Sequence, residues 1–255
     1  MIYFVGAGPG APDLITVRGK ELIERCDQII YAGSLVNPAL LDFAKKDCKI
    51  YNSASMTLEA VVDRFIYGEK ERWLTVRLHT GDPSIYGAIR EQMDALAACS
   101  IPFAVVPGVS SFCGAAAALN AEYTLPGVSQ TLIISRSVGR TAMPPKEDLS
   151  LLAAHGASMA IFLSTGLIED VRSKLLEAGL APETPAAIVY KATWPDEKVI
   201  RGTVDTLPAM RIELGADKTA LILVGGFLEN AYERSKLYDP AFSHGFRNKE
   251  QIRKK

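Results

Sequence analysis

The sequence predicts an α/β fold made of two α/β domains with mostly parallel or mixed sheets. Short apolar runs of β-type residues alternate with segments of helical periodicity, which is typical of parallel strands covered by helices on both faces. A second series of strands and helices begins after the turn-rich stretch TLPGVSQ at 124–130. We therefore expect domains at 1–124 and 125–229, followed by a charged and aromatic tail at 230–255.

The first domain is expected to alternate strands and helices from its first residues. IYFVG at 2–6 predicts a short buried strand, and a Gly/Pro loop then leads into a helix around 14–26. The further elements expected here are a strand at 28–33, a helix at 58–68, a strand within 73–83, a helix at 84–98, and a strand and helix within 103–121. Ligands of such sheets bind beyond the carboxyl ends of the strands, where three glycine turns lie: GAGPG, TGDPSIYG and PGVSS.

The second domain is expected to repeat this alternation. Its strands are predicted at 131–136, 157–165, 185–195, 198–204 and 219–228. Helices fall between them, for example at 167–179.

Charge and hydropathy argue against nucleic-acid and membrane partners. The net charge of −1 over 255 residues supplies no basic field for nucleic acid. Residues 95–121 carry no charge, but prolines, a Pro-Gly pair and serines interrupt them, so a strand, turn and helix are expected there instead of a membrane span. The first positive charge is Arg18, so the N-terminal segment lacks the basic region of a signal peptide.

The four cysteines point to reduced thiols and a cytoplasmic protein. None of them forms a C-x-x-C pair, and the three histidines are far from them and from one another in sequence. We therefore expect no structural metal site.

The first glycine loop nearly satisfies a dinucleotide fingerprint. Gly6, Gly8 and Ala11 fall on the G-x-G-x-x-G/A spacing. However, the strand at 28–33 is followed by no acidic residue for the ribose, and Pro9 and Pro12 remove two N–H donors from the loop. The loop is therefore expected to allow close backbone approach without binding phosphate.

Several motifs occur in a characteristic order along the chain: VGAGPGAPDLIT, YAGSLV, HTGDPSIYGA, PGVSS and VYKATWPDE. Together they resemble the tetrapyrrole (corrin/porphyrin) methyltransferase family, whose members use S-adenosylmethionine. The resemblance covers residues 1–228, and the tail motif SKLYDPAFSHGFR is similar as well. YAGSLV and YKATWPDE resemble the members that methylate C-11 of precorrin-4 in cobalamin biosynthesis. The resemblance also implies a homodimer with the cofactor in the cleft between two α/β domains.

The family pattern implies a set of residues that bind S-adenosylmethionine. Carried over to this sequence, they are Pro9, Thr80, Gly81, Asp82, Ile85, Ser110, Ser111, Leu163, Ala192 and Ala220. Ordinary core packing is the alternative for Leu163, Ala192 and Ala220. Asp82 also fits the role of a cap for the helix expected after it.

A tetrapyrrole substrate with several carboxylates needs cations and hydroxyl donors in an apolar trough. The candidates near strand ends are Tyr31, Ser34, His79, Arg136, Arg140 and Lys191. Each has a plain alternative as a solvated charge or a satisfied polar group. Asp13 is the candidate proton acceptor, because methylation of a ring carbon can require later loss of a proton. Methyl transfer itself needs little acid–base machinery, since positioning supplies much of the effect.

Other functions stay open at this level. Within the family, these are methylation of cobalt-precorrin-4, of uroporphyrinogen, of C-20 or C-17, of ribosomal RNA or of a modified histidine. Outside it, the alternatives are a dinucleotide-dependent oxidoreductase and a non-catalytic module that binds the cofactor.

Overall fold

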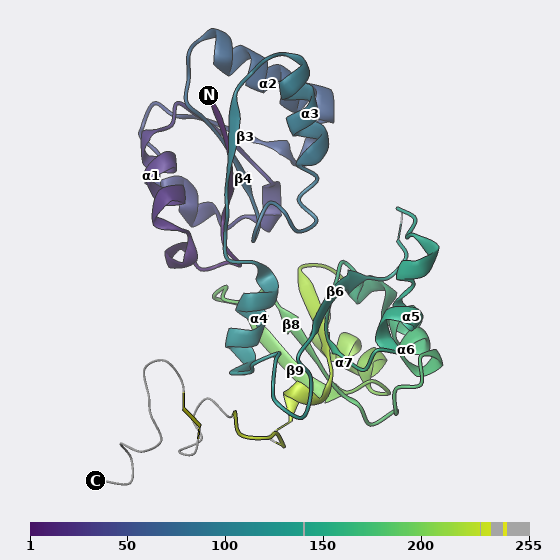
Figure 1. Ribbon diagram of the computed structural model, residues 1–255. Helices are drawn as coiled ribbons and strands as arrows, with labels where there is room; N and C mark the ends of the chain where they lie inside the picture. Colours follow the sequence, from purple (N-terminus) through teal and green to yellow (C-terminus); the bar gives the residue numbers. More distant parts are fainter. Residues whose placement is uncertain (140, 230, 236–241, 244–255) are drawn as a thin grey trace, which may run out of the picture. The chain divides into compact units, whose positions relative to one another are not determined.

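The computed structural model describes residues 1–139, 141–229, 231–235 and 242–243, and the chain divides into two compact units (Figure 1). The first unit comprises Met1–Ala118 together with Tyr190–Lys198. The second comprises Leu119–Val189 and the chain from Val199 onward. The segment at 190–198, which the sequence assigns to the second domain, thus belongs by its contacts to the first unit. The domain boundary expected at 124–125 stays a prediction.

The first unit contains a five-stranded sheet with the strand order β3-β2-β4-β1-β5. Its strand pairs are parallel, as expected for apolar strands separated by helices. The strands are β1 (Ile2–Gly6), β2 (Gln28–Tyr31), β3 (Lys49–Asn52), β4 (Thr75–His79) and β5 (Phe103–Val106).

The register brings the carboxyl ends of the central strands to one level. Gly6, the last residue of β1, pairs with His79, the last residue of β4. On the other side of β1, Val5 pairs with Val106, the last residue of β5. The loops that follow these three strands therefore start side by side at the same edge of the sheet.

Helices cover both faces of this sheet, as Figure 1 shows. α1 (Val17–Arg25) packs on one face, where Leu22 and Ile23 join a core with Val5 and Leu78. α2 (Leu58–Lys70) and α3 (Arg90–Ala98) cover the other face, where the core contains Phe4, Phe65 and Leu96. α4 follows β5 and spans Ser111–Leu119.

The second unit contains another five-stranded sheet, of order β6-β7-β10-β8-β9. β7 pairs parallel with β6 and antiparallel with β10, so this sheet is mixed. The strands are β6 (Leu132–Arg136), β7 (Ser158–Phe162), β8 (Pro185–Tyr190), β9 (Lys198–Thr203) and β10 (Ala220–Val224). The helices are α5 (Leu149–Ala153), α6 (Ile168–Glu177) and α7 (Leu207–Leu214), which bury their apolar stripes beside the sheet.

The α/β class with one parallel and one mixed sheet is confirmed. The helix predicted at 84–98 is wrong in its first part, because α3 begins only at Arg90. Tyr86 and Ala88 have φ angles of 54° and 48°, which a right-handed helix does not allow. Within the described residues, each helix is too short or too polar to cross a membrane.

Candidate active site

The turns after β1 and β4 are joined backbone to backbone. The Gly81 N–H donates to the Gly8 carbonyl at 2.8 Å, and the Gly8 N–H donates to the Gly81 carbonyl at 3.3 Å. Ahead of this pair, the Ala7 N–H donates to the His79 carbonyl at 2.7 Å. GAGPG and TGDP thus form one continuous rim at the carboxyl edge of the first sheet.

The turn after β5 joins the same rim by close approach. A Cβ built on Gly108 would lie 2.2 Å from the Gly81 carbonyl oxygen and 2.7 Å from the Gly6 Cα. Since real Cβ atoms do not come so close, only glycine lets these chains meet. The three glycine turns singled out from the sequence are therefore assembled at one place.

The Asp82 carboxylate fastens two of these turns together. Its Oδ2 accepts a hydrogen bond from the Gly108 N–H at 2.8 Å, while its Oδ1 accepts from the Ser84 N–H at 2.8 Å and from the Ser84 hydroxyl. Partial burial on its own raises the pKa of Asp82, but these hydrogen bonds outweigh it, so the pKa lies below its ordinary value. Asp82 caps its own turn as an aspartate and also anchors PGVSS.

The segment from the last residue of β8 to the first residue of β9, Tyr190–Lys198, lies against the GAGPG loop. The Trp194 indole N–H donates to the Pro9 carbonyl at 3.0 Å, and the Thr193 hydroxyl accepts from the Ala11 N–H at 2.9 Å. A Cβ on Gly10 would lie 2.0 Å from the indole Cδ1. We call Tyr190–Lys198 the strap, because it closes over residues 9–11.

The predicted cofactor residues of the first unit surround this rim. Pro9 and Ala192 are buried, and a Cβ on Gly114 of α4 would lie 2.7 Å from the Pro9 Cβ and 3.5 Å from the Ala192 Cβ. Ser110 is buried, whereas Thr80 is exposed. The remaining members, Ile85 and Ser111, are half-buried.

The predicted cofactor residues of the second unit form a separate pair. β7 and β10 are antiparallel with Ile161 opposite Ile222, and the same register carried two residues further sets Leu163 opposite Ala220. The Leu163 side chain is 70% exposed and its φ is 52°. A leucine exposed in a left-handed conformation is not core packing, and such strain is often found at functional sites.

The chain is similar to proteins of one known family. The family model of the Tetrapyrrole (Corrin/Porphyrin) Methylases matches residues 1–208. The chain belongs to this family. A cobalt-precorrin-4 C(11)-methyltransferase of Methanocaldococcus jannaschii is 52% identical over 247 residues, which cover 96% of this chain and 95% of that protein. A precorrin-4 C(11)-methyltransferase of a Sinorhizobium species is 42% identical, covering 97% of this chain and 98% of that protein.

The fold is also similar to solved structures of the family. The X-ray structure of a cobalt precorrin-4 methyltransferase, a cobalamin biosynthetic enzyme, superposes with a TM-score of 0.88. It is 44% identical and covers 90% of this chain and 96% of that one. This member of the tetrapyrrole methylase family thus shares its fold over most of its length with a structurally characterised relative.

The predicted substrate cations already have partners in the structure. Lys191 in the strap binds Asp196 through its Nζ at 2.6 Å, and this hydrogen bond raises the pKa of the lysine. The Arg136 guanidinium donates to the carbonyls of Ser137, Thr141 and Ala142 at 3.3, 3.0 and 3.3 Å. Arg136 therefore organises the loop that follows β6. Arg140, predicted beside it, lies outside the described residues.

The remaining predicted side chains differ in exposure. His79 is only 4% exposed, and burial together with the nearby Arg77 charge lowers its pKa to about 3. Tyr31 is half-buried at the end of β2, next to β4, and Ser34 follows in a short 3-10 turn. Asp13 is exposed in the 3-10 turn Pro12–Leu14, just after the strap contact at Ala11.

Three residues of this site are absent from the sequence-based prediction. Thr193 and Trp194 form hydrogen bonds with Ala11 and Pro9 at the GAGPG loop. Both belong to the motif VYKATWPDE, but neither was among the predicted site residues. Asn37 donates through its side-chain amide to the Gly10 carbonyl at 2.9 Å. The motif itself is the signal that could have identified the first two; nothing local marks Asn37.

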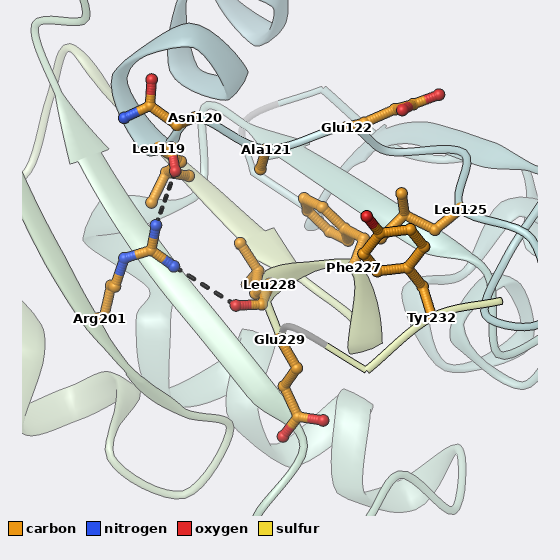
Figure 2. A pocket seen from close by; sticks show the side chains of 10 residues that line it. All are labelled: Leu119, Asn120, Ala121, Glu122, Leu125, Arg201, Phe227, Leu228, Glu229 and Tyr232. Atoms are coloured by element: carbon orange, nitrogen blue, oxygen red, sulfur yellow. Dashed lines mark hydrogen bonds between the residues drawn. The ribbon is translucent and has the colours of Figure 1, made fainter. Parts of the chain in front are cut away.

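A cavity of about 470 Å³ lies in the second unit, where Leu119, Arg201 and Phe227 are among the residues that line it. Figure 2 shows Arg201 pointing toward the carbonyl oxygens of Leu119 and Leu228, to which it donates at 2.8 and 3.4 Å. The predicted site residues are not among those that line this cavity.

Proposed function

We propose that this protein methylates C-11 of a precorrin-4 macrocycle, with S-adenosylmethionine as the methyl donor. The observation that carries the proposal is the 52% identity to a relative of that activity over 96% of the chain. The geometry of the rim supports it, because the turns that carry most of the proposed donor-binding residues meet at the carboxyl edge of a parallel sheet, where ligands of such sheets bind.

The residues at the rim fit such a donor. S-adenosylmethionine supplies a methyl group on a sulfonium, so the sulfur leaves as a neutral thioether and no strong acid or base is needed. The chain would hold it with Pro9, the turn from Thr80 to Ile85, Ser110, Ser111 and Ala192, and with Leu163 and Ala220 of the second unit. Their task is to align and to exclude water, and effective positioning can lower a barrier by about 7–11 kcal/mol.

The substrate side of the proposal concerns carboxylates. The residues that would contact the macrocycle are Tyr31, Ser34, Arg136, Arg140 and Lys191. Asp13 would accept the proton that is lost after the ring carbon is methylated. Arg136 has a planar guanidinium suited to bidentate pairing, although its hydrogen bonds to loop carbonyls occupy part of it. His79 is buried and neutral, so it would act on the macrocycle only through its position under the TGDP turn.

The presence or absence of cobalt in the macrocycle distinguishes two candidate substrates, cobalt-precorrin-4 and precorrin-4. The sequence motifs indicate precorrin-4, with cobalt-precorrin-4 as the alternative, and do not distinguish the two. Identity is 52% to the relative named for cobalt-precorrin-4 and 42% to the Sinorhizobium relative named for precorrin-4, which favours the cobalt form as the preferred substrate. Cobalt here is part of the substrate and not a cofactor of the protein.

A homodimer in the cytoplasm completes the proposal. The compartment is supported by the cysteine pattern of the sequence, four scattered cysteines without a C-x-x-C pair, and the dimer by the resemblance to the family. Light scattering coupled to size exclusion measures the oligomeric state directly, and a monomeric mass would remove that part of the proposal.

Calorimetry tests the choice of cofactor. We expect S-adenosylhomocysteine to bind with micromolar affinity, and NAD, NADP and FAD to give no heat. Tight binding of a dinucleotide without a response to S-adenosylhomocysteine would overturn the proposal.

A further inference from the structure

One face of β4 carries a row of buried polar side chains. Val76 and Leu78 point into the core beneath α1. Because side chains alternate along a strand, Thr75, Arg77 and His79 point to the opposite face, beneath α2 and α3. All three are buried.

Arg77 is the charged member of this row. It is 7% exposed, and among the described residues it has no carboxylate partner. Its Nη1 donates to the Ile30 carbonyl at 3.3 Å, and its Nε donates to Oε1 of Gln92 at 3.1 Å. Burial lowers its pKa to about 10, so it is still a cation at neutral pH. Burying a charge without an oppositely charged partner costs free energy. An arginine that is buried with neutral hydrogen-bond partners alone therefore points to a role other than stability.

Gln92 connects Arg77 to the turn that follows β4. It lies in the first turn of α3 and is 6% exposed. A guanidinium has no acceptor, so the Gln92 amide must present its oxygen to Arg77. Its Nε2 is thereby directed the other way, and it donates to the Ala88 carbonyl at 2.9 Å.

The turn that receives this hydrogen bond is conformationally strained. Tyr86 and Ala88 both have positive φ, and a Cβ on Gly87 would lie 2.1 Å from the Pro83 carbonyl oxygen. Left-handed conformations are unfavourable for residues that carry a Cβ, so outside contacts must hold them. Asp82 holds the beginning of the turn through Ser84 and Gly108, and Gln92 holds its end.

We propose that Arg77 and Gln92 are positioning residues for methyl transfer. The chain Arg77–Gln92–Ala88 fixes the end of the HTGDPSIYGA turn and thereby sets the position of Ile85 at the rim. This inference rests on the proposed function, because it assumes that the turn holds the methyl donor. Both side chains are buried, so they would act on the donor through the turn.

Gln92→Glu is the decisive variant. The glutamate keeps an acceptor for Arg77 and adds an ion pair, but it cannot donate to the Ala88 carbonyl. Gln92→Leu removes both contacts and leaves Arg77 unpartnered, so its fold can fail for a trivial reason. The matched control is Gln28→Leu, because Gln28 is fully buried and also donates to a backbone carbonyl, that of Arg64 at 3.1 Å, at the opposite end of β2 from the rim.

Hydrogen exchange and calorimetry provide the two readouts. In Gln92→Glu, we expect the backbone amides of residues 84–89 to exchange about tenfold faster in the free protein. We also expect S-adenosylhomocysteine to bind about tenfold more weakly, because one hydrogen bond to the turn is lost. The melting temperature of this variant should stay close to that of the wild type. Gln28→Leu should lower the melting temperature without changing either readout.

Two outcomes overturn the inference. One is a Gln92→Glu protein with unchanged exchange and unchanged affinity. The other is faster exchange with unchanged affinity, because the hydrogen bond would then serve stability alone. If the wild type itself fails to bind S-adenosylhomocysteine, the proposed function falls instead, while the exchange comparison still tests the link from Gln92 to the turn.

Discussion

The Trp194 indole occupies the space that a side chain at Gly10 would need. A Cβ on Gly10 would lie 2.0 Å from the indole Cδ1, and the indole N–H donates to the Pro9 carbonyl next to it. These residues are more than 180 positions apart in sequence, yet the glycine loop and the strap fit each other at this point. The contact explains why GAGPG needs its last glycine.

The first prediction concerns that fit. Gly10→Ala should lower the unfolding free energy by about 1–3 kcal/mol, because the new methyl group overpacks the indole and the Ala192 carbonyl. Chemical denaturation measures the loss. Gly139→Ala is the control, since a Cβ there meets nothing within 4 Å. Equal stability of the two alanine variants would contradict the packing described here.

The second prediction uses Trp194 as a reporter. Trp73, the other tryptophan, packs against Tyr67 at the far end of the first unit's strands, so Trp73→Phe leaves the strap indole as the only one. Its emission should change when S-adenosylhomocysteine is titrated in, because Trp194 hydrogen-bonds to the loop that would hold the ligand. If the wild-type response persists in Trp194→Phe, the strap does not sense the ligand.

The third prediction concerns the carboxylate that joins TGDP to PGVSS. Asp82→Asn removes the charge that accepts from Gly108 and Ser84, and hydrogen bonds to charged groups contribute about 1.5–3 kcal/mol each before solvent screening. We expect affinity for S-adenosylhomocysteine to fall about 10- to 100-fold. Calorimetry measures it, and Asp94→Asn, an exposed change on α3, is the control. An unchanged affinity in Asp82→Asn would show that this junction is irrelevant to the ligand.

The fourth prediction is a pH dependence that arises from His79. Its pKa is about 3 in the folded protein and about 6.5 in an unfolded chain, so below pH 6.5 the unfolded state binds the extra proton. The stability associated with neutral His79 is complete above pH 6.5 and is lost as the pH falls toward 3, by about 1.4 kcal/mol per pH unit.

Denaturation of the wild type and of His79→Phe between pH 7 and 5 isolates this effect. The wild type should lose stability over this interval, and the variant should lose distinctly less. The phenylalanine would pack beside Phe4, whose ring centroid lies 6.1 Å from that of His79. Parallel curves for the two proteins would contradict a buried neutral histidine.

Sequence patterns predicted the strands of this fold better than its strained turns. Apolar runs such as IYFVG and TVRLH are long enough to mark β1 and β4, and the rule on carboxyl edges then gathers the glycine turns correctly. β3 was not predicted because KIYN is short and mostly exposed, whereas α7 lies between two predicted strands, where a helix was expected without stated bounds. The start of α3 was misplaced because nothing in SIYGAI announces positive φ at Tyr86 and Ala88.

The meeting of the glycine turns was predictable because the turns themselves carry the residues that join them. The turns of TGDP and PGVSS are fixed by their own glycines and Asp82, so the spacing identified them. The contacts of the strap were not predictable from the sequence. The strap connects β8 and β9 of the second sheet, but its contacts assign it to the first unit, and no local pattern indicates this. Buried links such as Arg77 to Gln92 have no local signature either.

Product mapping tests directly which carbon this protein methylates. Purified protein is incubated with labelled S-adenosylmethionine and a panel of metal-free and cobalt-bearing precorrins, and NMR identifies the carbon that receives the methyl group. We predict methylation at C-11 of the precorrin-4 macrocycle, with the cobalt-bearing form used more efficiently. Methylation at another carbon, or no transfer to either form of precorrin-4, would contradict the proposed activity.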